Sequence, residues 1–245
     1  MTGYFSQFLD SGIRQKSGLR SGPEILGTGT SGSRRSSRRS ATRRIWCLAG
    51  CRPYHGSAQH LRGWEERRQA IAQAAEKAAR TRDVLARGGL ECPAITGAFE
   101  FESASGVYTE LQCGSYIFMD ADYGRNLDRD GTPIHAFEPS LFVWATVMSR
   151  PAEERAIVDA GLKALAFDSG PPNVWDEPAA TYERASDEHG RLAVTGATNR
   201  LRIGDKLKLV PGHCDPTVNL YDWYVGIRGD RVAAIWPITA RGAVY

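Results

Sequence analysis

Long apolar segments are absent from this chain of 245 residues. No stretch approaches the run of about 18 apolar residues that a membrane-crossing helix needs, so we expect no membrane span and no membrane partner. The first residues lack the apolar core and the small-residue cleavage site of a secretory signal, so we expect a cytoplasmic protein. With 42% hydrophobic residues, the chain can still build a core in one large domain or two small ones.

Cysteine is scarce and irregularly spaced. The five cysteines are an odd and scattered set: Cys47, Cys51, Cys92, Cys113 and Cys214. This pattern argues for free thiols in a reducing compartment and against a disulfide framework. No second Cys/His pair follows Cys47 and Cys51 at zinc-finger or zinc-ribbon spacing, so these two residues do not predict a zinc site.

Acidic residues are nearly absent from residues 1–52. This segment carries ten Lys/Arg and two acids, a net charge of +8, whereas the rest of the chain carries 21 basic and 26 acidic groups, a net of −5. It is also rich in Gly and Ser and too poor in apolar residues to offset chain entropy, so we expect a disordered basic tail. The tail could contact nucleic acid, act as a transit peptide or have no role. We favour the last and expect no nucleic-acid partner.

The clearest helical signal lies between Trp64 and Arg87. Apolar residues recur at helical spacing on one face, namely Ile71, Ala74, Ala75, Ala78 and Leu85, and charged residues mark the other, namely Glu65, Glu66, Arg67, Arg68 and Glu76. Gly88 and Gly89 provide a stop. Residues 92–96 then predict a short buried strand, and the unit indicates a fragment of an α/β layer or barrel.

Beyond Gly97 the hydrophobic period changes to two, which is typical of strands. The short strand candidates are Phe99/Phe101, Val107–Leu111, Tyr116–Met119, Leu141–Met148, Ala156–Val158, Leu165–Phe167 and Asp205–Val210. Residues 223–228 and 231–238 predict a hairpin around a Gly229-Asp230 turn. The C-terminal part is therefore expected to be a mainly β domain, a barrel or sandwich of about 130–150 residues.

The most distinctive local motif is Pro-Gly-His-Cys-Asp-Pro-Thr-Val-Asn, residues 211–219. A proline on each side predicts an extended backbone, in which the side chains of His213 and Asp215 point the same way while Cys214 faces elsewhere. An imidazole and a carboxylate together suit Zn²⁺, Mn²⁺ or a similar divalent ion. The alternative is an ordinary loop histidine followed by an aspartate that forms a turn.

Five separated motifs are recognisable as a set. They are Tyr54–His60, Ser105–Gln112, Gly114–Asp120, Val158–Leu165 and Pro211–Asn219. Together, and in this order, they resemble the D-threonine aldolase and D-serine dehydratase family over roughly residues 54–245. The resemblance implies a fold-type III pyridoxal-phosphate lyase, similar in architecture to alanine racemase. Such enzymes carry a (β/α)8 barrel that holds the cofactor and a C-terminal β domain.

The resemblance also implies roles for particular residues. In the family a divalent metal lies beside pyridoxal phosphate and is held by a His-x-Asp or His-x-Cys pair, which maps onto His213 and Asp215. The Asp variant is more similar to the aldolase branch. Tyr54, His55 and His60 map near the cofactor, Tyr54 as a cofactor neighbour and the two histidines as catalytic candidates; ordinary packing and turn roles are the alternative for all three.

Two features depart from the family. None of the five lysines, which are Lys16, Lys77, Lys163, Lys206 and Lys208, has the context of a Schiff-base lysine, and Gly97 is not followed by the Gly/Thr-rich phosphate loop. A closed barrel also needs about 200 residues or more, and fewer than about 55 remain. We therefore doubt that pyridoxal phosphate binds this chain, although the family uses it.

These observations predict three segments. Residues 1–52 form the basic tail, residues 53–97 a short α/β remnant of the barrel, and residues 98–245 a β domain like the C-terminal domain of alanine racemase. The resemblance implies a pyridoxal-phosphate- and metal-dependent lyase for β-hydroxy D-amino acids, and we expect this shortened form to be inactive alone. The alternative is a non-catalytic β domain that binds a metal or a partner. We expect the face that would meet the barrel to be uncovered, which favours a homodimer or other self-association.

Overall fold

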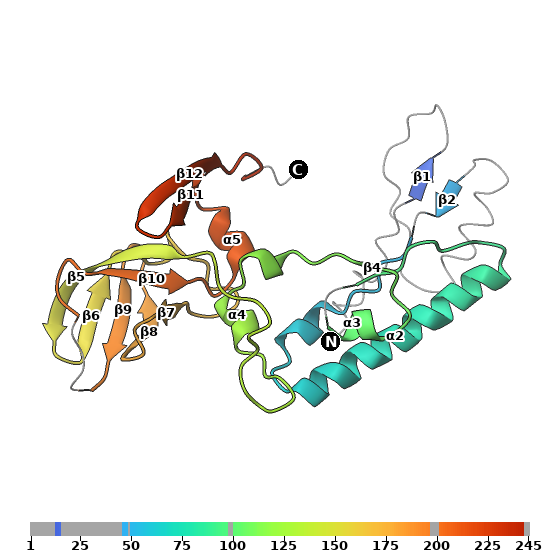
Figure 1. Cartoon of the computed structure of the whole chain (residues 1–245), viewed down its shortest axis with the longest axis horizontal. Coiled ribbons are helices and arrows are strands. Elements are labelled where there is room, and N and C mark those ends of the chain that lie inside the picture. Colours follow the sequence, from blue (N-terminus) through green and yellow to red (C-terminus); the bar gives the residue numbers. More distant parts are fainter. Residues whose placement is uncertain (1–12, 16–45, 49, 98–99, 197–200, 243–245) are drawn as a thin grey trace. The chain divides into compact units, whose positions relative to one another are not determined.

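The computed structural model describes residues 13–15, 46–48, 50–97, 100–196 and 201–242 (Figure 1). Its contacts divide into two compact units, one of residues 1–114 and 128–131 and the other of residues 115–127 and 132–245. Most of the predicted basic tail lies outside the described residues. Within it, strand β1 (Ile13–Gln15) pairs antiparallel with strand β2 (Trp46–Leu48).

The first unit is organised around helix α2, which spans Trp64–Arg87 as predicted. Its apolar face is buried: Ile71, Ala74, Ala75, Ala78 and Leu85 are each at most 6% exposed. The placement of Arg67 on the wet side was wrong, since it is 3% exposed. Its guanidinium donates to the carbonyl oxygens of Leu61 and Arg62 and lies over the ring of Phe101, so local partners compensate its burial.

Short elements complete the first unit. They are the 3₁₀ helix η2 (Gly56–His60), strand β3 (Thr96–Gly97), helix α3 (Phe101–Ala104) and strand β4 (Glu110–Leu111). Strands β3 and β4 pair in parallel, and Cys51 forms a parallel bridge with Ile95. Parallel pairing beside a helix is what an α/β barrel fragment requires. The strand predicted at Phe101 was wrong because that residue begins α3, and Phe99 lies outside the described residues.

The second unit is built on a six-stranded antiparallel sheet with the order β7-β10-β5-β6-β9-β8. The strands are β5 (Val143–Ala152), β6 (Arg155–Val158), β7 (Asn173–Trp175), β8 (Ala180–Ala185), β9 (Gly190–Val194) and β10 (Lys206–Val210). Figure 1 shows these strands side by side in yellow to orange. The two edge strands, β7 and β8, also contact each other, so the sheet nearly closes into a barrel.

The core of the second unit lies inside this curved sheet. It is formed by Ala145, Val147, Ala156, Val158, Ala160, Leu165, Ala180, Tyr182, Leu192, Val194, Leu201, Leu207 and Leu209. Strand β10 shows the expected alternation, with Leu207 and Leu209 buried and Lys206 and Lys208 exposed. The mainly β architecture predicted for this part of the chain is confirmed.

Five further elements belong to the second unit. They are the 3₁₀ helix η3 (Ser115–Ile117), helix α4 (Ala121–Gly124), helix α5 (Cys214–Val218) and the hairpin strands β11 (Trp223–Arg228) and β12 (Arg231–Pro237). The hairpin prediction is confirmed, and Gly229 has the positive φ, 64°, that the tight turn requires. The predicted strand at 116–119 was wrong because η3 occupies its start. The predicted strand at 165–167 was also wrong, since these residues have no regular structure and the amide of Leu165 donates to the carbonyl oxygen of Gly161.

No helix within the described ranges combines the length and the apolar character that crossing a membrane requires.

Candidate metal centre

His213 and Asp215, the two predicted metal ligands, lie where β10 leads into helix α5 (Figure 1). His213 is the N-cap residue, with an extended backbone at φ −144° and ψ 129°, and Asp215 lies in the first helical turn. The extended backbone predicted through Asp215 was wrong, because Pro216 is part of that turn. A proline is tolerated there, since the amide hydrogen it lacks would have no partner inside the helix.

The helical geometry still brings the two side chains near each other. Nε2 of His213 lies 3.9 Å from Oδ2 of Asp215. An ion held at about 2.1 Å from each ligand atom can contact both when these atoms are at most about 4.2 Å apart. The two atoms therefore lie close enough to contact one divalent ion, near the upper end of that range. Within the described part of the chain, no group of three or more His, Cys, Asp or Glu gathers to hold a metal, so other coordination positions would fall to water or substrate.

A buried carboxylate ties α5 to α4. Asp120, 2% exposed, is the N-cap of α4 and accepts a hydrogen bond from the amide of Tyr123 at 2.9 Å. Its other oxygen accepts from the amide of Cys214, the first residue of α5, at 3.4 Å. Burial raises the pKa of Asp120, and these two amides and the charge of His213 oppose that effect. One side chain thus satisfies orphan amides of both helices.

Helix α4 also fixes the backbone before His213. The carbonyl oxygen of Pro211 accepts a hydrogen bond from the amide of Ala121 at 2.8 Å, and that of Gly212 accepts from the amide of Asp122 at 3.2 Å. Gly212 also packs directly on the carbonyl of Gly170, where a Cβ atom would have no space. The loop of residues 168–171 is therefore held against the segment that carries the predicted ligands.

Arg125, just after α4, holds this loop from another side. Its guanidinium donates to the carbonyl oxygens of Ser169 at 3.1 Å and Pro171 at 2.7 Å. Gly170 between them has φ 98°, a conformation that favours glycine. Helix α4, the 168–171 loop and the start of α5 thus form one scaffold around His213.

Cys214, between the two predicted ligands, points away from them. Its Sγ donates to the carbonyl oxygen of Met119 at 3.1 Å, and the residue is 1% exposed. Burial raises the pKa of the Cys214 thiol to about 12, with the charges of Asp120 and Asp215 adding to the effect. Because only the thiolate binds metals well, Cys214 is unsuited to be a ligand.

Asp168 is the residue of this site that sequence reasoning missed. Its Oδ2 lies 2.6 Å from Nδ1 of His213. Partial burial raises the pKa of Asp168, but the hydrogen bond and charge of His213 outweigh this effect and the pKa lies below its usual value. Asp168 belongs to no motif singled out above and is 45 residues from His213, so only the fold brings them together. Its one local signal was the Asp-Ser-Gly-Pro-Pro turn composition of residues 168–172.

The three predicted cofactor and substrate neighbours lie in the first unit. His55 is the N-cap of η2, His60 is its exposed last residue, and the ring of Tyr54 lies under the guanidinium of Arg52. The structure gives these residues positions at the start of the α/β unit. Their assigned roles stay predictions.

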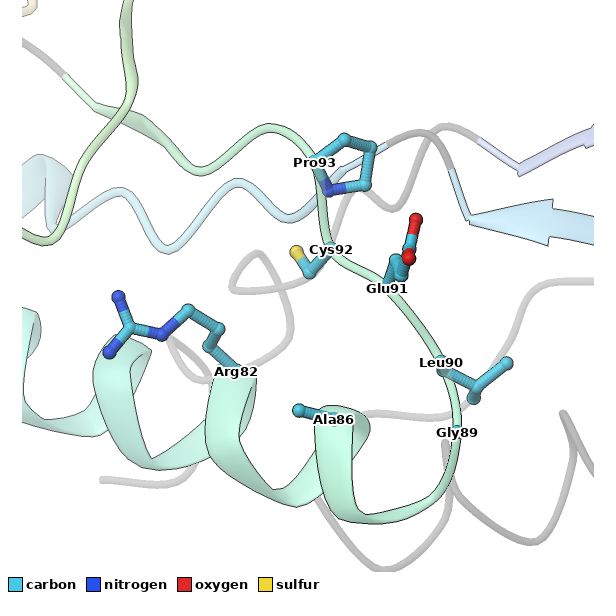
Figure 2. Close-up of a pocket in the computed structure, with 7 residues that line it drawn as sticks. All are labelled: Arg82, Ala86, Gly89, Leu90, Glu91, Cys92 and Pro93. Carbon is cyan, nitrogen blue, oxygen red and sulfur yellow. The ribbon is translucent and has the colours of Figure 1, made fainter.

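A pocket in the first unit lies beside the C-terminal end of α2. Figure 2 shows Arg82 and Ala86 on the helix facing the segment of residues 89–93 that follows it. None of the predicted site residues lines this pocket. Its lining consists of Arg82, Ala86, Gly89, Leu90, Glu91, Cys92 and Pro93.

Comparison with known proteins identifies the β domain. Residues 140–227 match the family described as "Putative serine dehydratase domain". The chain is also 51% identical over 199 residues to a D-threonine aldolase from Arthrobacter sp, and 45% identical over 202 residues to a 3-hydroxy-D-aspartate aldolase from Paracoccus denitrificans (strain Pd 1222). Each alignment covers 80% of this chain and 52% of the relative, so the chain spans about half the length of these curated relatives.

Solved structures show the same similarity. A D-threonine aldolase from Filomicrobium marinum superposes with a TM-score of 0.80 at 44% identity, covering 87% of this chain and 58% of that one. A D-threo-3-hydroxyaspartate dehydratase in its metal-free form gives a TM-score of 0.68 at 25% identity, covering 87% and 62%. An alanine racemase-like protein from Idiomarina loihiensis shares the fold, with a TM-score of 0.55 at 19% identity, covering 72% and 52%. The predicted family resemblance is confirmed.

Proposed function

We propose that this chain holds a divalent ion, Mn²⁺ or Zn²⁺, between His213 and Asp215 and forms the metal-bearing part of a lyase for β-hydroxy D-amino acids. The supporting observation is the 3.9 Å approach of an imidazole nitrogen to a carboxylate oxygen in a chain 51% identical to a D-threonine aldolase. When bound, the ion would supply a Lewis acid for the substrate's β-hydroxyl group.

The side chains of the site divide this work. His213 has Nδ1 occupied by Asp168, which leaves Nε2 to bind the ion. The side chain of Asp215 is 82% exposed, so it can bind the ion on a side that a small polar substrate can reach. Cys214 is buried and takes no part.

Pyridoxal phosphate does not fit the residues that the structure describes. A Schiff base needs a lysine amine in a protected site, yet Lys77, Lys163, Lys206 and Lys208 are all exposed. Lys163 pairs with Glu188 at 2.8 Å, Lys206 donates to Oγ1 of Thr146 at 2.6 Å, and Lys208 lies over the ring of Phe142. Lys16 lies outside the described residues. We therefore derive no step through this cofactor.

A metal titration tests the proposal. Mn²⁺ should bind the purified full chain with one site, measured by calorimetry or by loss of the free Mn²⁺ electron paramagnetic resonance signal. His213→Ala and Asp215→Ala should each weaken binding at least tenfold, while Asp187→Ala, an exposed carboxylate on another loop, should not. Equal binding by all four proteins would refute the assigned ligands.

A second candidate function is a non-catalytic β domain that binds metal or a partner, and the exposure of the four described lysines favours it for the isolated chain. The two candidates differ in one assay. With D-threonine, Mn²⁺ and pyridoxal phosphate, a lyase releases acetaldehyde and glycine, whereas a non-catalytic domain binds the ion and releases neither. If borohydride reduction attached the cofactor to one of the four described lysines, the conclusion that none of them suits a Schiff base would be wrong.

The remaining parts of the proposal follow the family. Residues 53–97 derive from the barrel and residues 98–245 form the β domain. Tyr54, His55 and His60 lie near the substrate or cofactor, and the protein is cytoplasmic.

Self-association is supported by the hairpin of β11 and β12. Its apolar side chains are widely exposed: Trp223 57%, Val225 54%, Ile235 60% and Trp236 55%. Apolar surface of this kind favours association between chains.

A further inference from the structure

The imidazole of His213 faces a different carboxylate through each of its nitrogens. Nδ1 lies 2.6 Å from Oδ2 of Asp168, and Nε2 lies 3.9 Å from Oδ2 of Asp215. We propose that Asp168 is a positioning residue that holds the proton of His213 on Nδ1 and thereby leaves Nε2 unprotonated and directed toward Asp215. This inference rests on the proposed function insofar as Nε2 is the nitrogen that would bind the ion.

The assignment follows from hydrogen-bond chemistry. A carboxylate oxygen accepts hydrogen bonds, and Oδ2 of Asp168 lies within hydrogen-bond distance of Nδ1 of His213, at 2.6 Å. Nδ1 of His213 must therefore donate its hydrogen to Asp168. A neutral imidazole carries one hydrogen, so Nε2 then keeps its lone pair. That tautomer is the one a metal ion needs at Nε2.

Asp168 is held for this role by the fold. Ser169 donates its hydroxyl to the same carboxylate oxygen at 3.2 Å. The loop behind it is fixed by Arg125 and by the close packing of Gly170 on Gly212, one residue before His213. The donor and acceptor therefore sit on two segments that cannot move apart without breaking these contacts.

Asp168 is not a third ligand of the proposed ion. Its contact is with Nδ1, whereas the predicted ion lies at Nε2, the other ring nitrogen. A carboxylate in this place fixes the orientation of the ring and raises its basicity, and removal of such a partner typically weakens metal affinity about 10- to 100-fold. We expect a loss in that range for Asp168.

The first experiment measures the tautomer of His213 in the metal-free full chain. With ¹⁵N-histidine labelling at pH 8.5, two-bond ¹H–¹⁵N correlation spectra show which ring nitrogen carries the hydrogen, and His213→Ala identifies the signal among the five histidines. We expect hydrogen on Nδ1 in the wild type and a mixture of the two tautomers in Asp168→Asn. Hydrogen on Nε2 in the wild type would overturn the inference, whatever the fate of the metal proposal.

The second experiment measures the affinity for Mn²⁺ alone. Asp168→Asn, which keeps the shape of the side chain, should bind 10- to 100-fold more weakly than the wild type, and Glu188→Gln, which removes an exposed carboxylate paired with Lys163, should bind normally. Normal binding by Asp168→Asn beside a loss in His213→Ala would overturn the inference and leave the ligand pair intact. No Mn²⁺ binding by the wild type would refute the proposed function, and the tautomer would then decide the inference.

Discussion

Gly212 and Gly170 meet with no space for a side chain between them. A Cβ atom on Gly212 would lie well inside contact distance of the carbonyl oxygen of Gly170, which is backbone and cannot turn aside. This contact sets the separation between the loop that carries Asp168 and the segment that carries His213. Position 212 needs a glycine because the two backbones approach so closely. Position 170 favours glycine for a different reason, its left-handed φ.

Gly212→Ala should therefore separate the two segments. We expect a loss of about 1–3 kcal/mol in the free energy of unfolding, because an inserted methyl group in a packed region forces backbone shifts. Affinity for Mn²⁺ should fall as well. Chemical denaturation and metal titration measure the two effects.

Gly124→Ala is the matched control for this change. Gly124 ends α4, and nothing lies within 4 Å of a Cβ atom built there. Alanine should be neutral or stabilise by up to about 1 kcal/mol, since it favours helix more than glycine does. If Gly212→Ala were as stable as Gly124→Ala, the packing argument would be wrong.

Cys214→Ala separates the stability of the site from its chemistry. The thiol is buried and donates to the carbonyl oxygen of Met119, so its loss should cost about 1–2 kcal/mol. Mn²⁺ affinity should stay within about twofold of the wild type, because the high pKa keeps the thiol protonated and out of the coordination sphere. A large loss of affinity in a folded variant would make Cys214 a ligand.

Thiol labelling of the wild type gives an independent measure of the burial of Cys214. Cys214 should resist iodoacetamide at pH 8 until the protein unfolds, whereas the partly exposed Cys92 and Cys113 should react in the native state. Peptide mass spectrometry distinguishes the sites. Rapid labelling of Cys214 in the native protein would contradict its burial.

Elements that depend on local signals were predictable from the sequence. Helix α2 has the predicted bounds because its apolar periodicity and its Gly88-Gly89 stop are both local. The β11–β12 hairpin was predictable for the same reason. Strands β8 and β9 were missed although both alternate, because inward positions are filled by small residues such as Ala180 and Gly190. Position 190 has no room for a side chain, because the ring of Tyr182 from the neighbouring strand occupies the space of a Cβ atom.

The site was predictable only as a pair of residue types. The spacing of His213 and Asp215 predicts a metal site. The extended backbone predicted there was wrong, because a proline can stand in the first turn of a helix, as Pro216 does in α5. Asp168 could not be found, and Asp120 was singled out only as the last residue of the Gly114–Asp120 motif, because each reaches the site from a distant segment, with Asp120 94 residues from Cys214. Nonlocal hydrogen bonds leave no spacing signal in a single sequence.

Tyr182→Phe tests the core of the second unit. The hydroxyl of Tyr182 donates to the carbonyl oxygen of Ala160 at 2.6 Å, and the residue is 2% exposed. Its loss leaves a buried carbonyl without this donor and should cost about 1–2 kcal/mol at pH 8. Tyr116→Phe, at a residue 45% exposed, should change stability little.

The cost of Tyr182→Phe should also shrink at high pH. Burial raises the pKa of Tyr182 to about 12, whereas an unfolded tyrosine ionises near 10. Between these values the folded state binds more protons than the unfolded state, so the wild type loses stability as the pH rises. The variant lacks this titration. Urea unfolding of both proteins between pH 8 and 11 should show the gap narrowing, and a constant gap would contradict the burial of the hydroxyl.

The hairpin gives the test of self-association. Val225 and Ile235 are directly paired across β11 and β12, and both are more than half exposed. Because this apolar pair contributes little to the core of its own chain, Val225→Lys with Ile235→Lys should lower the unfolding free energy by at most about 2 kcal/mol, including the repulsion between two lysines directly opposite each other. The two like charges should repel a second copy, so light scattering after size-exclusion chromatography should show a lower mass than for the wild type. Asp187→Asn with Glu188→Gln, at exposed residues between β8 and β9, changes the net charge by the same +2 and controls for a change of charge alone. A wild type that is already monomeric would refute association through this surface.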